Sequence, residues 1–267
     1  MIEIIKAIIL GIIQGITEWL PISSTGHLIL FEQLWSFGDP KFFEVFKVVI
    51  QFGSILAVCV LYFKRLNPFL SRKTETEKRE IWSLWFKIII GCIPAGIIGV
   101  LFDDVVEDVL SGVLVIAAAL IIYGIAFIVL ENTKRRVRIN RLEQLDYKTA
   151  FGIGCFQVLA LIPGTSRSGS TILGGSILGC SRTVSSEFSF FLAVPVMAGA
   201  SLLKVIKFGF NFTFIQIVML LVGTFVAFVV SIIAIRFLLN YIRKHDFKLF
   251  GYYRIILGII IIAFYLF

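Results

Sequence analysis

The stretch QGITEWLPISSTGHL, residues 14–28, places polar side chains in the middle of an apolar segment. These side chains belong to Gln14, Glu18, Ser23, Ser24, Thr25 and His27. Pro21 has no backbone N–H to donate, so we expect the apolar segment 4–35 to break near its centre. Polar groups and broken backbone are tolerated at membrane depth only where protein or a wet cavity surrounds them. The stretch therefore predicts a re-entrant helix–loop–helix hairpin.

A second apolar segment, residues 149–180, is interrupted in the same way by IPGTSRSG, residues 162–169. Pro163 and the two glycines disrupt the helical pattern, and the interruption is again polar. We predict a second hairpin that, like the first, enters and leaves the membrane on one side. Its tip offers the side chains of Thr165, Ser166, Arg167, Ser168 and Ser170.

The composition places the whole chain in a membrane. Of its 267 residues 58% are hydrophobic and 16% charged, and the mean hydropathy is +0.97, whereas soluble domains are about 45–50% apolar. We predict an all-α, polytopic membrane protein that forms one domain over residues 1–267. Six runs have the length of a transmembrane helix: residues 43–63, 82–101, 109–130, 187–206, 212–238 and 251–267.

The two interrupted segments also match each other in sequence. A shift of 143 positions aligns them without a gap. The matched pairs include Ala7 with Ala150, Gly11 with Gly154, Gln14 with Gln157, Ser23 with Ser166, Gly26 with Gly169, Glu44 with Glu187 and Lys64 with Lys207. This pattern predicts an internal repeat over residues 6–64 and 149–207. Three spans separate the hairpins, so the repeat has inverted topology, in which broken helices meet near the membrane midplane.

Charge in the loops predicts the orientation. Loops 64–80 and 131–149 are rich in Lys and Arg, whereas segment 102–108 carries four acids and no base. Because basic loops stay in the cytoplasm, the first two should lie inside and the third outside. The net charge of +8 then reflects membrane topology, and we expect no nucleic-acid partner. The first hairpin should then enter from outside and the second from the cytoplasm, with their tips facing each other.

The polar residues of the two tips suit phosphoryl transfer. Gln14 and Glu18 are four residues apart and share one helix face, where they could hold a hard cation such as Mg²⁺. Arg167 supplies a planar fork for phosphate oxygens, and the helix ends at the tips attract anions. A hydroxyl near His27 could be a nucleophile with its base. Each polar residue also has an alternative structural role, as a cap or as a partner for broken backbone.

The motifs QGITEWLPISSTGH and IPGTSRSG resemble the two signatures of the undecaprenyl-pyrophosphate phosphatase family, also called the bacitracin-resistance family. The resemblance covers essentially the whole chain. It implies an enzyme of the bacterial plasma membrane that uses a divalent cation, Mg²⁺ or Ca²⁺, and whose site opens toward the external face. Its reaction would hydrolyse the terminal phosphate of undecaprenyl pyrophosphate, which yields the lipid carrier for cell-wall polymers.

Carried onto this chain, the resemblance implies roles for individual residues. Glu18 is the motif carboxylate and, with Gln14, the metal ligand. Ser24 and His27 are the hydroxyl–imidazole pair, and Arg167 clamps the phosphate. The remaining substrate-binding residues would be Ser23, Thr25, Gly164, Thr165, Ser166, Ser168 and Gly169. The family pattern allows Glu or Gln at the first position, and Gln14 removes a charge that a two-carboxylate metal site would need.

The sequence disfavours one rival function and leaves a second function and the oligomeric state open. A type-2 phosphatidic-acid phosphatase would need His six residues after the motif Arg, but Leu173 follows Arg167 at that distance. A transporter or flippase of polyprenyl phosphates would share the inverted repeat and the anion-binding tips but need no nucleophile. The glycine-rich spans also leave a homodimer open. The expected partners are thus the lipid substrate and the lipids of the membrane.

Overall fold

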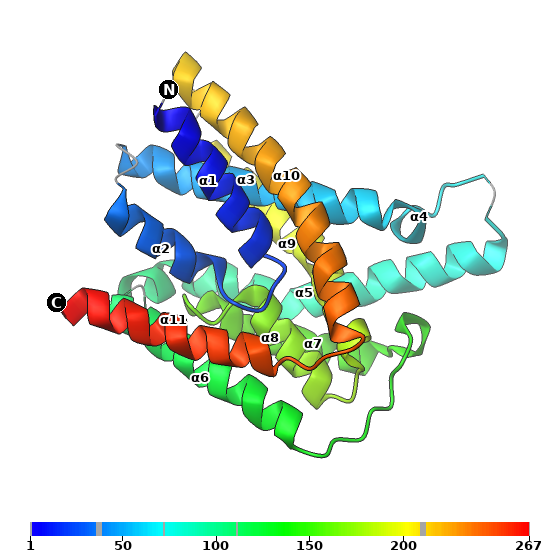
Figure 1. Cartoon of the computed structure of the whole chain (residues 1–267). Helices are drawn as coiled ribbons and strands as arrows, with labels where there is room; N and C mark the ends of the chain where they lie inside the picture. Colours follow the sequence, from blue (N-terminus) through cyan, green and yellow to red (C-terminus); the bar gives the residue numbers. More distant parts are fainter. Residues whose placement is uncertain (1, 36–38, 72, 111, 209–211, 267) are drawn as a thin grey trace.

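The structure is a computed structural model that describes residues 2–35, 39–71, 73–110, 112–208 and 212–266, without the side chains of residues 32–34 and 103–108. Its helices are α1 (Ile2–Thr17), α2 (Ser24–Leu34), α3 (Pro40–Leu61), α4 (Phe63–Leu66), α5 (Glu75–Leu110), α6 (Val113–Asn132), α7 (Tyr147–Val158), α8 (Arg167–Ile177), α9 (Arg182–Phe208), α10 (Phe214–Ile242) and α11 (Lys248–Leu266) (Figure 1). Short 3-10 turns at Leu142–Gln144 and Leu159–Leu161 and an isolated bridge between Ile139 and Cys180 complete the regular structure of these residues. The all-α class is confirmed.

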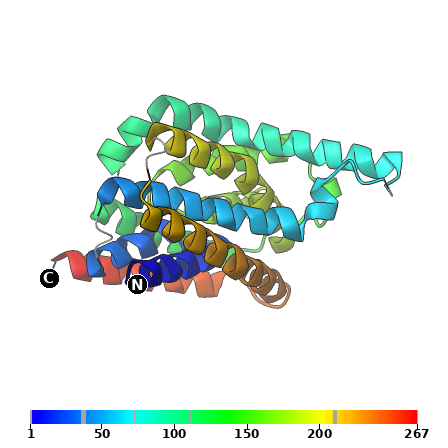
Figure 2. The same ribbon diagram turned by 90° about the horizontal axis from the view of Figure 1, so that it is seen from above.

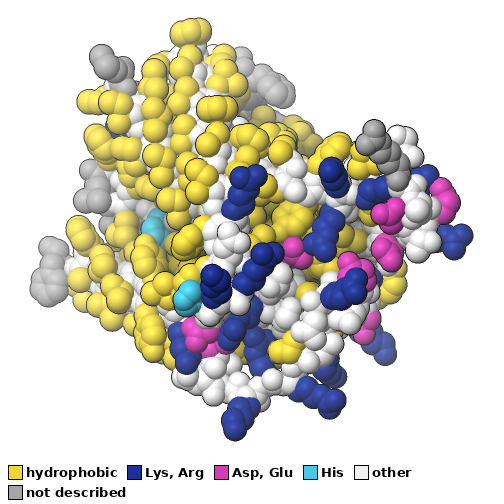
Figure 3. All heavy atoms as spheres, turned by 45° about the vertical axis from the view of Figure 1, so that its right-hand side comes forward, with side chains coloured by type: hydrophobic (Ala, Val, Ile, Leu, Met, Phe, Trp, Pro, Cys, Tyr) yellow, Lys and Arg dark blue, Asp and Glu magenta, His cyan; other side chains and the backbone are white. Residues whose placement is uncertain are grey.

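Six helices in the described part of the chain are long and apolar enough to cross a membrane. They are α3, α5 as far as Phe102, α6, α9, α10 and α11, and each overlaps one of the six predicted spans. The chain is thus a multi-pass membrane protein. Figure 3 shows charged side chains gathered over one end of the molecule, while apolar side chains cover most of the remaining face.

The acidic segment 102–108, predicted as a loop, is instead the continuation of α5. Neither Gly nor Pro occurs between Gly99 and Gly112, so no local signal ends the helix before Leu110. Gly112 then stands at the N-cap of α6. The loop prediction was therefore wrong, and the orientation drawn partly from this segment stays a prediction.

Both interrupted segments break where Pro and Gly predicted a break. The first helix of each segment ends before the tip, at Thr17 in α1 and at Val158 in α7. Ser23 and Ser166 precede the second helices, and both have φ 71°, in the left-handed region that side chains rarely adopt. Each serine caps its helix by accepting a hydrogen bond from a glycine N–H. The path of these hairpins relative to a membrane stays a prediction.

The helices of the two hairpins pack against spans distant in the sequence. α1 lies along α10, and α7 lies along α5, while α6 and α11 form a third close pair (Figures 1 and 2). Small residues make these approaches possible: a Cβ on Gly11 would lie 2.7 Å from Gly223 O, and one on Gly124 would lie 2.7 Å from Gly251 O. The first hairpin thus packs against α10, which follows the second hairpin in the chain, and the second hairpin packs against α5, which follows the first. This reciprocal packing supports the inverted repeat, which remains a prediction.

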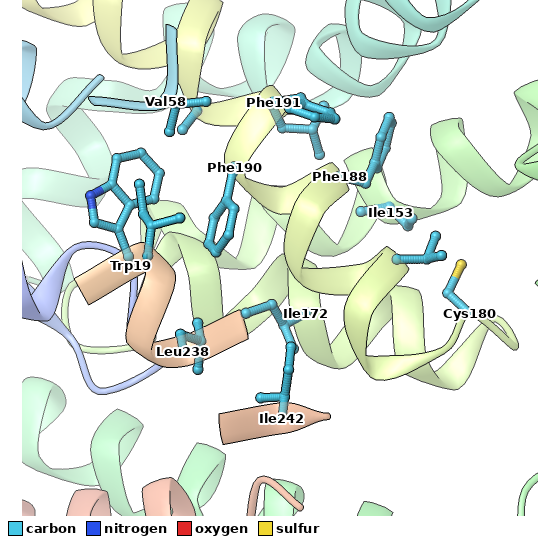
Figure 4. Close-up of a cluster of buried hydrophobic side chains, with 14 of the residues drawn as sticks. Trp19, Val58, Ile153, Ile172, Cys180, Phe188, Phe190, Phe191, Leu238 and Ile242 are labelled. Atoms are coloured by element: carbon cyan, nitrogen blue, oxygen red, sulfur yellow. The ribbon is translucent and has the colours of Figure 1, made fainter. Parts of the chain in front are cut away.

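A buried apolar cluster fixes the first tip against the rest of the molecule. Trp19 follows Glu18 in the break, is fully buried, and meets Phe190 of α9 edge-on with ring centroids 5.3 Å apart. Figure 4 shows these two rings next to each other, with Ile172 of α8 and Leu238 of α10 in the same cluster. The tip carries a large apolar anchor, which holds the polar residues on either side of it in place.

Candidate active site

A small cavity lies between the two hairpin tips. The first hairpin contributes Glu18, Ser24 and Thr25 to its wall, and the second contributes Gly164, Ser166 and Arg167. The rest of the wall is formed by Gln51, Gln157, Ala160, Leu161, Ile162, Pro163, Val196 and Met197. The volume is about 220 Å³, below the roughly 300–1,000 Å³ of pockets that take drug-sized ligands. A phosphate-bearing head group fits such a space, whereas a whole polyprenyl lipid does not.

An ion pair joins the tips across this cavity. Arg167 Nη2 lies 3.1 Å from Glu18 Oε1, and both side chains are largely buried. Arg167 Nη1 donates to the carbonyl of Ser189 at 2.8 Å, and the guanidinium lies over the Trp19 ring at 5.7 Å. These contacts fix the orientation of the guanidinium. Its buried Nε–H has no partner among the described residues.

The other carboxylate oxygen of Glu18 accepts two further hydrogen bonds from the first hairpin. Gln14 Nε2 donates at 3.0 Å and Ser24 Oγ at 3.4 Å. The spacing of four residues between Gln14 and Glu18 brings the two side chains to one face, as predicted. An amide, a hydroxyl and a guanidinium thus all donate to the Glu18 carboxylate.

Two helix N-termini point at the same cavity. α2 begins at Ser24 and α8 begins at Arg167, and both residues line the cavity wall. The positive ends of two eleven-residue helices therefore converge on one space, which favours an anion there. With the Glu18 carboxylate balanced by Arg167, the helix ends give the cavity a net positive character.

Several residues predicted to bind substrate form hydrogen bonds within and between the hairpins in the structure. The hydroxyl of Ser23 caps α2, and the N–H of Gly169 is capped by Ser166. Thr165 donates its hydroxyl to Leu159 O and Ile162 O, and Ser168 donates to Glu18 O and Leu20 O across the two tips. None of the side chains of Ser23, Thr165, Ser168 or Gly169 forms part of the cavity wall described above. These contacts shape the tips, and the role of the four residues in substrate binding stays a prediction.

His27 is not hydrogen-bonded to Ser24 within the described residues. Its Nδ1 lies 2.7 Å from Ser23 O, so that nitrogen carries the proton and donates, and its Nε2 accepts from the hydroxyl of Tyr253 at 2.6 Å. The two rings are stacked, with centroids 5.6 Å apart. Tyr253 of α11 thus orients the imidazole, and the hydroxyl of Ser24 is paired with Glu18 instead.

Arg254 of α11 is a residue that the sequence reasoning missed. It is fully buried and donates to backbone carbonyls of both tips: Pro21 O at 3.1 Å, and Gly164 O and Thr165 O at 2.9 Å each. The available signal was a charged residue in the middle of an apolar span, which is costly unless it has a function. Arg254 thus fixes the positions of the two broken loops relative to each other.

Oxygen atoms around Glu18 are suited to a hard cation. The buried Gln14 Oε1 has no partner among the described residues, and the Nε2 of the same amide donates to the Glu18 carboxylate, which also accepts from the Ser24 hydroxyl. Mg²⁺ and Ca²⁺ bind such oxygens together with phosphate oxygens and water. The described side chains contain no cluster of three or more His, Cys, Asp or Glu, so a cation here would depend on the ligand for part of its coordination.

Comparison with known proteins identifies the family. The sequence model of the bacitracin resistance protein BacA family matches residues 7–260. The chain is 56% identical to the undecaprenyl-diphosphatase of Desulfitobacterium hafniense, over 99% of this chain and 97% of that protein. It is 55% identical to undecaprenyl-diphosphatase 1 of Clostridioides difficile, over 99% and 97%, and 54% identical to the undecaprenyl-diphosphatase of Enterococcus faecalis, over 98% and 97%. With these similarities along its full length, the chain belongs to the bacitracin resistance protein BacA family.

Proposed function

We propose that the protein hydrolyses undecaprenyl diphosphate to undecaprenyl phosphate and inorganic phosphate in the bacterial plasma membrane. This reaction recycles the lipid carrier for cell-wall polymers, and it accounts for bacitracin resistance. The observation that carries the proposal is the Glu18–Arg167 ion pair at a small cavity between two helix N-termini. The names of relatives above 50% identity supply the substrate.

The contacts suggest how the terminal phosphate is held and attacked. Arg167 and the two helix ends neutralise the phosphate, because phosphoryl transfer depends mainly on positioning and charge. Ser24 Oγ attacks the terminal phosphorus while its proton passes to Glu18 Oε2, the oxygen to which it already donates. The Ser24 Oγ–P bond forms and the bond from that phosphorus to the bridging oxygen breaks, so undecaprenyl phosphate leaves. Water then hydrolyses the phosphoserine and releases inorganic phosphate.

The remaining site residues support this assignment indirectly. Thr25 and Ser166 line the cavity and offer hydroxyls to phosphate oxygens. His27 Nε2 accepts from the Tyr253 hydroxyl in the structure, and it would take a proton from a water molecule in the second step once that hydrogen bond is exchanged for one to the water. A divalent cation, Mg²⁺ or Ca²⁺, is part of the proposal, with Glu18 and Gln14 as its protein ligands. It would supply further neutralisation of the diphosphate charge.

The size of the cavity fits a head group whose tail stays in the bilayer. A space of about 220 Å³ accepts the diphosphate, and the polyprenyl chain remains outside it among membrane lipids. We propose that the cavity opens toward the external face, because the Lys- and Arg-rich loops 64–80 and 131–149 belong in the cytoplasm. A homodimer is not required by any of these contacts.

Phosphate release by purified protein in detergent tests the proposal. We expect inorganic phosphate from undecaprenyl diphosphate with no second compartment present, and a loss of at least about 10²-fold in Ser24→Ala. The matched control is Ser201→Ala in α9, whose buried hydroxyl donates to Val48 O at 3.0 Å away from the cavity. Binding of the lipid without phosphate release by the wild type would support a transporter instead. Full activity of Ser24→Ala would assign the attack to water.

A further inference from the structure

Gln157, near the C-terminal end of α7, is a buried amide without a hydrogen-bond partner. Its side chain is 2% exposed, and neither Nε2 nor Oε1 has a partner among the described residues. It also forms part of the cavity wall between the tips. Burying an amide without hydrogen bonds is unfavourable, so such a group in a native protein needs an explanation. Its position on the cavity wall makes a ligand the direct explanation.

The corresponding amide of the first hairpin shows why Gln157 is left unpaired. Gln14 lies 143 residues earlier in the chain and donates to Glu18, four residues further along its own helix segment. Four residues after Gln157 stands Leu161, which also lines the cavity but accepts no hydrogen bond through its side chain. The second hairpin thus keeps the amide and lacks the acid. The donor of Gln157 remains available to whatever enters the cavity.

The rest of the cavity wall indicates which part of a lipid diphosphate Gln157 meets. The charged groups, Glu18 and Arg167, are paired with each other and serve the terminal phosphate, where most of the negative charge lies. Next to Gln157 in the chain, the wall continues with Ala160, Leu161 and Ile162, and α9 adds Val196 and Met197. An apolar wall with neutral amides suits the phosphate that is esterified to the isoprenoid, because this phosphate carries less charge and adjoins hydrocarbon.

We propose that Gln157 is a substrate-binding residue whose Nε2 donates to an oxygen of the lipid-bearing phosphate of a polyprenyl diphosphate. The inference rests on the proposed function and deepens it. This phosphate is retained when the terminal one is removed, so Gln157 contacts the product, a polyprenyl monophosphate, as well as the substrate. The amide therefore contributes to affinity for the lipid and does not act on the reacting phosphorus.

The test compares Gln157→Leu with Thr224→Val in the full-length protein. Leu keeps the approximate volume of Gln and removes the unpaired amide, so the melting temperature without ligand should stay the same or rise. Thr224 Oγ1 in α10 is likewise a buried atom without a partner among the described residues, and it lies outside the cavity wall. Thr224→Val is therefore a matched control, and its stability should respond in the same direction while its kinetics stay those of the wild type.

Three probes separate the two phosphates. In Gln157→Leu the KM for undecaprenyl diphosphate should rise about tenfold or more, the usual scale for a hydrogen bond to a charged group, while kcat changes by less than about threefold. Competitive inhibition by undecaprenyl phosphate should weaken by a similar factor. Inhibition by inorganic phosphate should stay unchanged, because that product occupies the Arg167 side of the cavity.

Other outcomes overturn the inference. An unchanged KM for the diphosphate and unchanged inhibition by the monophosphate would show that Gln157 does not touch the lipid head. Weaker inhibition by inorganic phosphate alone would place Gln157 at the terminal phosphate. A lower melting temperature without ligand, at unchanged KM, would make the amide a packing residue. If the wild type released no phosphate but bound undecaprenyl phosphate in a Gln157-dependent way, the proposed hydrolysis would fail while the lipid-phosphate site would stand.

Discussion

The α1–α2 and α7–α8 hairpins share the backbone conformation of the serine that precedes each second helix, yet their tips carry different chemistry. Ser23 and Ser166 share a φ of 71° and the same capping role, and they are 143 positions apart. At the same offset, Glu18 of the first hairpin corresponds to Leu161 of the second, and Ser24 corresponds to Arg167. One tip therefore supplies the carboxylate and hydroxyl, and the other supplies the guanidinium.

This division means that neither hairpin holds a complete site. The buried carboxylate of Glu18 and the buried guanidinium of Arg167 compensate each other only when the tips meet. A buried charge is costly unless it is paired, so the pairing also favours convergence of the two tips. The comparison thus predicts that replacing either Glu18 or Arg167 affects the structure and activity of both hairpins. It also predicts that removing a residue that contacts the backbone of both tips affects the two tips equally.

Removing the guanidinium should have the largest effect. Arg167→Ala deletes the phosphate clamp and leaves Glu18 without its cationic partner, so we expect phosphate release to fall by about 10³-fold and the melting temperature to drop. Arg167→Lys keeps the charge but loses the fork, and it should retain lipid binding better than turnover. Steady-state phosphate release and lipid binding, measured in parallel, check both. Near-normal turnover in Arg167→Ala would mean that the second tip is not part of the active site.

Removing the carboxylate tests the other side of the pair. Glu18→Gln keeps the size and the contact with Gln14 but cannot take the Ser24 proton, so turnover should fall by about 10²-fold, the scale of a lost acid–base group. Phosphate release at saturating undecaprenyl diphosphate measures this effect. Retention of more than about a tenth of the activity would make Glu18 a structural partner of Arg167. Comparison with Arg167→Ala then shows which hairpin carries more of the catalysis.

Arg254 contacts both tips, so its removal should affect them equally. Arg254→Met deletes hydrogen bonds to Pro21 O, Gly164 O and Thr165 O. We expect about a tenfold loss of kcat/KM and a lower melting temperature, because hydrogen bonds from a charged donor stabilise more than neutral ones. Protease sensitivity should rise at both tips, around Pro21 and around Gly164. Exposure of one tip alone would contradict a shared clamp.

The sequence predicts best those features that depend on residues close together in the chain, namely the helix breaks and the membrane spans. Pro21 and Pro163 remove backbone donors, and the broken segments and six spans follow from such features and from apolar run length. The meeting of Glu18 with Arg167 could be anticipated because both stand in the interruptions. The clamp of Arg254 on Pro21 could not, because 233 residues separate them. The pattern of residues within α11 does not indicate which distant backbone carbonyl accepts a hydrogen bond from Arg254.

His27 and Ser170, also 143 positions apart, each have a tyrosine partner, and the two tyrosines make a matched pair of tests. Tyr253 of α11 donates to His27 at 2.6 Å, whereas Tyr123 of α6 accepts from Ser170 at 3.2 Å. Tyr253→Phe should reduce turnover about threefold to tenfold, because the imidazole loses its orientation while a water can replace the bond. Tyr123→Phe should change turnover less than twofold and act mainly on stability. Equal effects on turnover would mean that His27 has no special role in the first hairpin.

The smallest effect is expected where the two hairpins still carry the same residue. Gln14→Glu puts a second carboxylate 3.0 Å from Glu18, and two buried acids this close cannot both ionise unless a cation lies between them. If Glu18 and residue 14 share a divalent cation during turnover, the change should be tolerated within about threefold at saturating Mg²⁺, and half-maximal activity should need less Mg²⁺ than in the wild type.

Phosphate release titrated against Mg²⁺ for the wild type and Gln14→Glu measures this effect, with Gln157→Glu as the counterpart in the second hairpin. That variant has no acid four residues along its helix and should lose lipid affinity at every Mg²⁺ concentration. A large loss in Gln14→Glu that added Mg²⁺ does not relieve would place the cation, and the neutralisation it supplies, away from the first hairpin.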